Sequence, residues 1–204
     1  MELSKYFNGK TGFGEHKQTA INLMKLSIHI LNEFNIDYFL ISGTLLGLVR
    51  HNDFIPWDDD IDLIVHFDIF KKIKEIYLKY GKILIIKVIQ NYLIKISFRF
   101  EGIKLKQNDY NWPFIDLFTY YVAPEPDNRL HFFKKIWEND KFYPPIETTF
   151  QNIQVKIPRV PLYFLYVNYG LDCLSVYKSS SYLHKKEKHI KKIVKYNIHK
   201  NGEL

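Results

Sequence analysis

The sequence predicts a single mixed α/β or α+β domain of the soluble, globular class. Of the 204 residues, 47% are hydrophobic and 25% are charged, a balance typical of globular proteins and not of disordered or collagen-like chains. Helical and strand periodicities alternate along the chain, and no repeat or low-complexity linker interrupts them. Aromatic residues make up 17% of the chain, which is enough to fill a large core.

The first predicted element is a helix over residues 16–35. Its apolar residues Ala20, Met24, Ile28 and Leu31 recur at spacings of four, four and three, which is typical of a helix packed on a core. Shorter patterns predict the other elements in chain order: a strand at 37–41, a helix at 45–50, a strand at 60–66, a helix at 69–80 that Gly81 ends, strands at 82–89 and 92–100 joined at Gln90-Asn91, a strand at 114–120, a short helix near 129–138, a strand at 150–157 and a helix at 158–169.

The net charge of +7 is concentrated near the C-terminus. Between His184 and Lys200 there are seven lysines and one glutamate, so this stretch carries 7 − 1 = +6 and the rest of the chain carries 7 − 6 = +1. We therefore expect a folded domain over residues 1–175 and a basic, helical tail over residues 176–204. A solvated tail is the simplest interpretation, and binding to an anionic membrane surface is an alternative; nucleic acid is an unlikely partner for the nearly neutral body.

The sequence also predicts a compartment. The N-terminal residues MELSKYFNGKTGFGEHKQ lack the apolar core of a secretory signal, and the apolar run over 38–49 is too short to cross a bilayer. The single cysteine, Cys173, excludes an intrachain disulfide and a cysteine-built zinc site, which favours a reducing environment. We expect a cytoplasmic protein that could be peripherally attached to a membrane.

The stretch from Ser42 to Leu63 contains the residues with the clearest chemical meaning. Gly43-Thr44 ends a strand and opens a helix, so free backbone N–H groups and a hydroxyl are expected at a helix N-terminus, which is a common phosphate site. Arg50 follows six residues later and could contact an anion or brace the loop. Four carboxylates then fall within five residues as the chain enters an apolar strand: Asp58, Asp59, Asp60 and Asp62.

The carboxylates of this stretch predict a site for a divalent cation. Asp60 and Asp62 are two residues apart on a predicted strand, so their side chains point to the same face. Two like charges held this close repel each other, and Mg²⁺ or Mn²⁺ is the usual compensation for carboxylates. Asp116 is the single charge in the apolar strand at 114–120, and burying it is costly unless it faces a cation or a partner.

Two further pairs of residues are weaker candidates. Lys95 and Arg99 lie on the polar face of the strand at 92–100 and could bind phosphate, although a solvated sheet face is the simpler explanation. Trp57 and Trp112 each stand beside a proline and close to an acidic motif. They could stack on a base or a sugar, but packing of the loop is slightly favoured.

The run GTLLGLVRHNDFIPWDDDIDL resembles the LicD family, which includes bacterial phosphocholine transferases and fukutin-related protein. The resemblance reaches Phe114-Ile115-Asp116-Leu117-Phe118 and the later segments YPP, VKIP and YGLD, so it covers roughly residues 15–175. It implies a nucleotidyltransferase-like fold with a small mixed sheet flanked by helices. Gly43-Thr44 stands where that superfamily has Gly-Ser, a change that keeps the hydroxyl.

The resemblance also implies a function. It is the transfer of a phospho-alcohol group, such as phosphocholine or ribitol phosphate, from a CDP-activated donor to a hydroxyl of a glycan or glycolipid, with Mg²⁺ or Mn²⁺. Asp60, Asp62 and Asp116 would be catalytic and would bind metal together with Asp58, and the donor would be bound by Gly43, Thr44, Arg50, Lys95 and Arg99. Two alternatives remain: a nucleotidyltransferase that places a nucleoside monophosphate on a small molecule, protein or RNA end, and a non-catalytic binding module.

Overall fold

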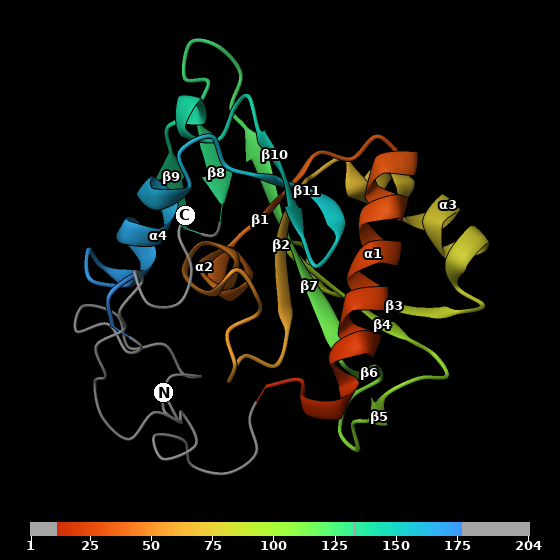
Figure 1. Cartoon of the computed structure of the whole chain (residues 1–204). Helices are drawn as coiled ribbons and strands as arrows, with labels where there is room; N and C mark the ends of the chain where they lie inside the picture. The colour runs from red at the N-terminus through yellow and green to blue at the C-terminus, as the bar shows by residue number, and fades with distance from the viewer. Residues whose placement is uncertain (1–11, 133, 177–204) are drawn as a thin grey trace.

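The computed structural model describes residues 12–132 and 134–176 and confirms a mixed α+β architecture (Figure 1). In these ranges, seven strands form one mixed sheet, whose main path runs β1 (Tyr38–Leu40), β2 (Ile61–His66), β7 (Phe114–Val122), β4 (Leu93–Phe98) and β3 (Leu84–Gln90). The second half of β7 also pairs with β8 (Leu130–Phe132), which pairs with β9 (Lys135–Trp137). Among these pairings, β2 with β7 is parallel and the others are antiparallel.

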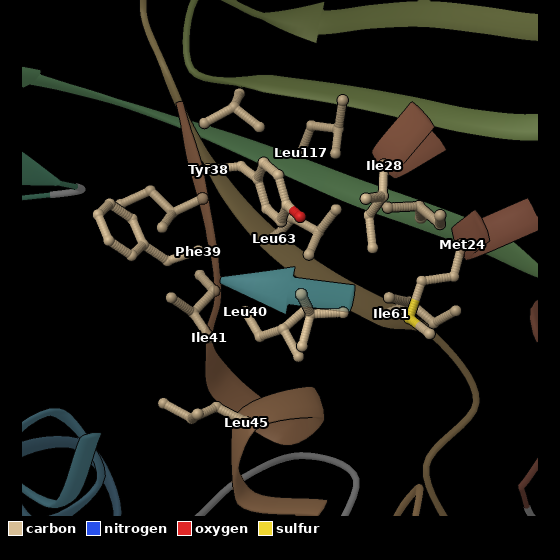
Figure 2. Packing of buried hydrophobic residues seen from close by; sticks show 14 of the residues in the cluster. Met24, Ile28, Tyr38, Phe39, Leu40, Ile41, Leu45, Ile61, Leu63 and Leu117 are labelled. Atoms are coloured by element: carbon tan, nitrogen blue, oxygen red, sulfur yellow. The ribbon is translucent and has the colours of Figure 1, made fainter. Parts of the chain in front are cut away.

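Helices cover the two sides of this sheet. Helices α1 (Lys17–Glu33) and α3 (Ile69–Tyr80) lie on one side, and α2 (Ser42–His51) and α4 (Pro161–Tyr169) lie on the other (Figure 1). The predicted spacing of α1 is confirmed, because Met24 and Ile28 are buried against Ile61, Leu63 and Leu117 of the sheet (Figure 2). Burying each such side chain contributes about 1.5–3 kcal/mol, so this contact is a main source of stability.

Strand alternation decides which residues face away from α1. Leu63 pairs with Leu117 and Ile94 also pairs with Leu117, so these three residues share the face that α1 covers. The neighbouring position on each strand faces the opposite way. The opposite face of the sheet is therefore where the acidic side chains of β2 and β7 must lie.

Two sequence predictions are wrong in the last third of the described chain. The helix expected near 129–138 is the β8–β9 hairpin followed by a short 3₁₀ turn, η3 (Asn139–Lys141). Leu130 and Phe132 are buried and the intervening His131 is half-buried, which is the alternation of a strand, and pairing with β7 overrides helix propensity here.

The strand expected at 150–157 is instead a hairpin of β10 (Ile146–Phe150) and β11 (Ile153–Ile157). Its turn residues Gln151 and Asn152 have φ of 52° and 60°, the left-handed conformation that a tight two-residue hairpin turn requires. A small additional ladder joins β5 (Ile103–Lys104) to β6 (Asn111–Trp112).

The lysine-rich tail predicted for residues 176–204 lies almost wholly outside the described residues, because the description ends at Val176. Over the part of the chain that is described, no helix combines the length and the apolar character needed to cross a membrane.

Candidate metal centre

A row of charged side chains crosses three adjacent strands on the sheet face opposite α1. Asp62 of β2 is the register partner of Asp116 of β7, and Asp116 is in turn the partner of Lys95 of β4. Neighbouring strands are about 4.8 Å apart, so side chains in one row are within reach of each other. The pairing of β2 with β7 thus places the two carboxylates side by side.

The structure gathers the predicted carboxylates into one cluster. Asp60, Asp62 and Asp116 each offer a carboxylate oxygen, and these atoms all lie within 4.8 Å of one another. Counted over the whole residue, Asp60, Asp62 and Asp116 are only 8%, 8% and 7% exposed. The cluster is therefore shielded from water, and its negative charges repel each other strongly. The predicted convergence of these three residues is confirmed.

A second group of carboxylates shares one member with the first. Asp58, Asp59 and Asp60 also offer oxygens within 4.8 Å of one another, so Asp60 belongs to both groups. An all-carboxylate donor set suits a hard divalent cation such as Mg²⁺ or Mn²⁺, with water or substrate oxygens as its remaining ligands. The residues present therefore fit the cation that the sequence predicts.

The first turn of α2 is built around the carboxylates. The Thr44 hydroxyl oxygen accepts a hydrogen bond of 2.9 Å from the backbone N–H of Asp62, and Thr44 is 1% exposed. A Cβ atom on Gly43 would lie 2.1 Å from Oδ2 of Asp58, so only glycine leaves room for that carboxylate. The Asp58 side chain occupies space beside the helix N-terminus, where the sequence predicted a phosphate, and negative charge is favourable at this end of a helix.

Arg50 is held by the C-terminal segment of the described chain. Its Nη1 donates hydrogen bonds of 2.9 Å to the carbonyl oxygens of Cys173 and Val176, and its Nε donates one of 3.0 Å to Nε2 of His51. The guanidinium carbon is 5.6 Å from the ring centroid of Trp57. These bonds give Arg50 a bracing role, directed to the segment after α4, and its contact with phosphate stays a prediction.

His51 can accept that hydrogen bond because it is neutral. Burial, together with the charge of Arg50, lowers the pKa of His51 from 6.5 to about 3. The imidazole therefore keeps its lone pair on Nε2 at ordinary pH.

Lys95 lies beside the carboxylate cluster, and its binding of a donor phosphate stays a prediction. Its ammonium group contacts the carboxylate of Asp116, and the two side chains are 13% and 11% exposed. The nitrogen is also 3.9 Å from the ring centroid of Phe114 and 5.3 Å from that of Tyr110. The Tyr110 ring therefore lies near the cluster, which no sequence pattern indicated, and burial together with the charge of Asp116 raises the pKa of Tyr110.

Arg99 has different neighbours from Lys95. Its Nε and Nη2 donate hydrogen bonds of 3.1 and 2.9 Å to the carbonyl oxygen of Gly81, and Nη2 donates one of 3.2 Å to that of Leu84. These bonds fix the connection between α3 and β3. The structure does not bring Arg99 to the carboxylate cluster, and nothing in these contacts supports a role in binding the donor.

Trp57 is buried in the protein, and Trp112 is half-buried beside the acidic loop. Trp57 is 3% exposed and its ring lies 5.9 Å from the ring of His51. Trp112 donates a hydrogen bond of 2.6 Å from Nε1 to the backbone oxygen of Asp59, and its ring stacks on Phe13 at 6.2 Å. Packing is thus the better description of both residues, and Trp112 helps to position the acidic loop.

Comparison with known proteins identifies relatives. The chain is 35% identical over 63 residues to the lipopolysaccharide cholinephosphotransferase LicD of Haemophilus influenzae, a match over 31% of this chain and 24% of that protein. It is 32% identical over 150 residues to the uncharacterized protein RT0683 of Rickettsia typhi, covering 69% of this chain and 42% of that protein. It is 42% identical over 41 residues to the human ribitol 5-phosphate transferase FKRP, covering 20% of this chain and 8% of that protein. The matches thus span less than half the length of each of these relatives.

A solved structure and a family profile complete the comparison. The lincosamide antibiotic adenylyltransferase LnuA with bound lincomycin is similar at a TM-score of 0.45 and 12% identity, over 70% of this chain and 84% of that one. The sequence model of the nucleotidyltransferase domain described as LicD/FKTN/FKRP matches residues 35–160, which include β1, α2 and the whole carboxylate cluster. On that match, the chain belongs to the LicD/FKTN/FKRP family of nucleotidyltransferase domains.

Proposed function

We propose that this protein is a metal-dependent transferase that moves a phospho-alcohol group from a CDP-activated donor to a hydroxyl of a glycan or glycolipid. The main support is the convergence of Asp60, Asp62 and Asp116 within 4.8 Å on one buried sheet face. The second support is the relatives, whose names describe a cholinephosphotransferase and a ribitol 5-phosphate transferase. Phosphocholine and ribitol phosphate are therefore the first groups to test.

In this proposal the carboxylates divide the work between binding and proton transfer. Asp60 and Asp62, with Asp58, would hold Mg²⁺ or Mn²⁺ and Asp116 would complete the site; the ion would supply charge neutralisation for the diphosphate of the donor. Asp116 orients the acceptor hydroxyl and accepts its proton. The acceptor oxygen forms a bond to the phosphorus of the phospho-alcohol group, the bridging P–O bond breaks, and CMP leaves with the bridging oxygen.

Lys95 is the residue best placed to bind the donor in this scheme. Its ammonium group already lies against Asp116 and is 13% exposed, so it can move between the carboxylate and a phosphate oxygen with a small change of side-chain rotamer. Gly43 and Thr44 act through the cluster instead. They make room for Asp58 and tie the first turn of α2 to Asp62.

Product analysis tests the proposal directly. The protein is incubated with Mg²⁺ or Mn²⁺ and CDP-choline, CDP-ribitol or a nucleoside triphosphate, each with and without a glycan acceptor. Release of CMP together with labelling of the acceptor supports the phospho-alcohol transferase. Release of pyrophosphate from the triphosphate would instead identify a nucleotidyltransferase.

A pair of aspartate variants separates the site from general effects of charge. Asp62→Asn removes one carboxylate from the cluster, whereas Asp109→Asn changes an exposed aspartate that pairs with Lys87. We expect Mn²⁺ to raise the melting temperature of the native protein and of the Asp109 variant but not that of the Asp62 variant, because a ligand that binds only the folded state stabilises it. Equal shifts in all three proteins would exclude the cluster as the cation site.

A further inference from the structure

A cavity of about 570 Å³ opens where β4 gives way to β8 along one edge of β7. Phe118 of β7 pairs with Leu93, the first residue of β4, whereas Tyr120 pairs with Phe132 of β8. The other edge of β7 is already paired with β2 at Tyr120, so β4 and β8 must follow one another along the same edge. The cavity lies at this junction, and its volume falls in the range of binding sites for small molecules.

Three exposed aromatic side chains border the cavity. They are Phe67, Tyr92 and Tyr121, which are 46%, 44% and 50% exposed. Each lies an even number of residues along the chain from a residue of the face that α1 covers, and backbone hydrogen bonds to β7 extend the ladder to Phe67 and Tyr92. By strand alternation the rings therefore continue that face, whereas Asp116 faces the opposite way. The sheet thus separates a ligand in this cavity from the carboxylate cluster.

Neighbouring rings hold two of these aromatic side chains in place. Tyr121 stacks on His131, its register partner on β8, with ring centroids 4.7 Å apart and ring planes inclined by only 11°. Phe67 meets the ring of Phe70 in α3 edge to face, at 5.2 Å. Because Tyr121 is half-exposed although His131 covers one face of its ring, the opposite face of that ring is available to stack on a flat ligand.

The lining of the cavity is positively charged. Lys134 and Lys135 both line it, and among the residues that the structure describes no aspartate or glutamate does. The ammonium group of Lys135 donates a hydrogen bond of 3.0 Å to Oδ1 of Asn168, which is a neutral amide and leaves the charge in place. The carboxylate of Asp127 lies 3.5 Å from Nε2 of His131 and is already in an ion pair with an arginine. The cavity therefore favours an anionic ligand.

We propose that this cavity binds a nucleoside monophosphate. The base stacks on the ring of Tyr121, the phosphate contacts Lys134, and the amide of Asn91, which also lines the cavity, can pair with the edge of the base. A neutral flat ligand would leave both lysines unused, and a sugar phosphate without a base would leave the aromatic rings unused. The proposal needs none of the carboxylates and is independent of the proposed transferase activity.

Calorimetry on the full-length chain tests the proposal. The buffer contains EDTA, so that a cation at the carboxylate cluster cannot contribute to binding. The probes are AMP, adenosine, which lacks the phosphate, and ribose 5-phosphate, which lacks the base. We expect one AMP to bind per chain, adenosine and ribose 5-phosphate to bind at least tenfold more weakly, and the affinity for AMP to fall as salt is added.

Two matched double variants locate the binding site. Tyr121→Ser/Lys134→Ser should bind AMP at least tenfold more weakly than the native protein. The control Tyr77→Ser/Lys104→Ser changes a tyrosine of α3 that is 54% exposed and an exposed lysine of β5, neither of which lines the cavity, and it should bind AMP like the native protein. Asp62→Asn should also leave AMP binding unchanged, because its side chain lies on the other face of the sheet.

Three results would overturn the proposal. They are the absence of AMP binding without a metal, binding of adenosine or ribose 5-phosphate as tight as that of AMP, and an equal effect of the two double substitutions. Loss of AMP binding in Asp62→Asn would place the nucleotide at the carboxylate cluster and would equally overturn it. Tighter binding of an adenylate hexamer than of AMP would assign the cavity to single-stranded RNA instead of a free nucleotide.

Discussion

The close approach of Gly43 to Asp58 makes a quantitative prediction. In Gly43→Ala the new Cβ would lie 2.1 Å from Oδ2 of Asp58, and contacts of this kind are not tolerated, so the buried carboxylate must move by more than an ångström. Overpacking of this kind costs about 1–3 kcal/mol. Without the clash, alanine in place of glycine within a helix would stabilise the protein by about 0.5–1 kcal/mol.

A double-mutant cycle isolates the clash from the change in helix propensity. Gly43→Ala is measured by urea unfolding in the native background and in Asp58→Ala, where no carboxylate is left to collide with. We expect destabilisation in the first case and slight stabilisation in the second, which is a coupling of about 1–3 kcal/mol between the two positions. The Mn²⁺-induced rise in melting temperature should also shrink in Gly43→Ala.

Gly47 provides the control for this cycle. A Cβ there would lie 2.7 Å from the backbone oxygen of Asp53, which Asp58 does not influence, so Gly47→Ala should cost the same in both backgrounds. If Gly43→Ala changed the free energy of unfolding equally with and without the Asp58 carboxylate, the steric argument would be wrong.

Three other predictions concern neighbouring side chains. Thr44→Val removes the acceptor of a buried backbone N–H and should lower the free energy of unfolding by about 1–3 kcal/mol, measured in urea, while Thr44→Ser should restore most of it. Lys95→Met removes a cation that competes with Mn²⁺ for Asp116. Calorimetry should therefore show that Mn²⁺ binds about tenfold more tightly, which corresponds to about 1.4 kcal/mol. Unchanged or weaker binding of Mn²⁺ would contradict this prediction. Because the pKa of His51 is lowered to about 3 in the folded protein, the unfolded chain takes up a proton first as the pH falls below 6.5. Stability should therefore fall with decreasing pH, by about 1.6 kcal/mol between pH 6.5 and about 5, and His51→Gln should lack this contribution in urea unfolding at both pH values.

The elements of the sheet that carry the site were predictable because their signals are local. Alternation over β2 and β7 and helical spacing in α1 depend only on which residues must be buried, and the structure buries Leu63, Leu117 and Met24 as those patterns require. The region after β7 was less predictable. Its β8 and β9 are only three residues each and depend on the pairing of β8 with β7, and its Gln151-Asn152 turn is not one of the glycine-containing pairs that mark a hairpin.

The same distinction holds for the candidate site. The convergence of Asp60, Asp62 and Asp116 follows from the two-residue period of a strand and from the burial of a single charge, so it could be predicted. The contacts of Arg50 and Arg99 could not be predicted in this way. The carbonyl acceptors of Arg50 lie 123 and 126 residues away in sequence, and the acceptors of Arg99 are backbone carbonyls that no side-chain pattern reveals.

The bonds from Arg50 to the carbonyl oxygens of Cys173 and Val176 have a practical consequence for shortening the chain. A truncation after α4 would look harmless in a sequence comparison, because the family match ends at residue 160. It would nevertheless remove two acceptors from a guanidinium group that is only 4% exposed, and an inadequately solvated buried cation is strongly destabilising. The shortest version that keeps both carbonyls ends after Val176, so a minimal domain for crystallisation should stop no earlier than that residue.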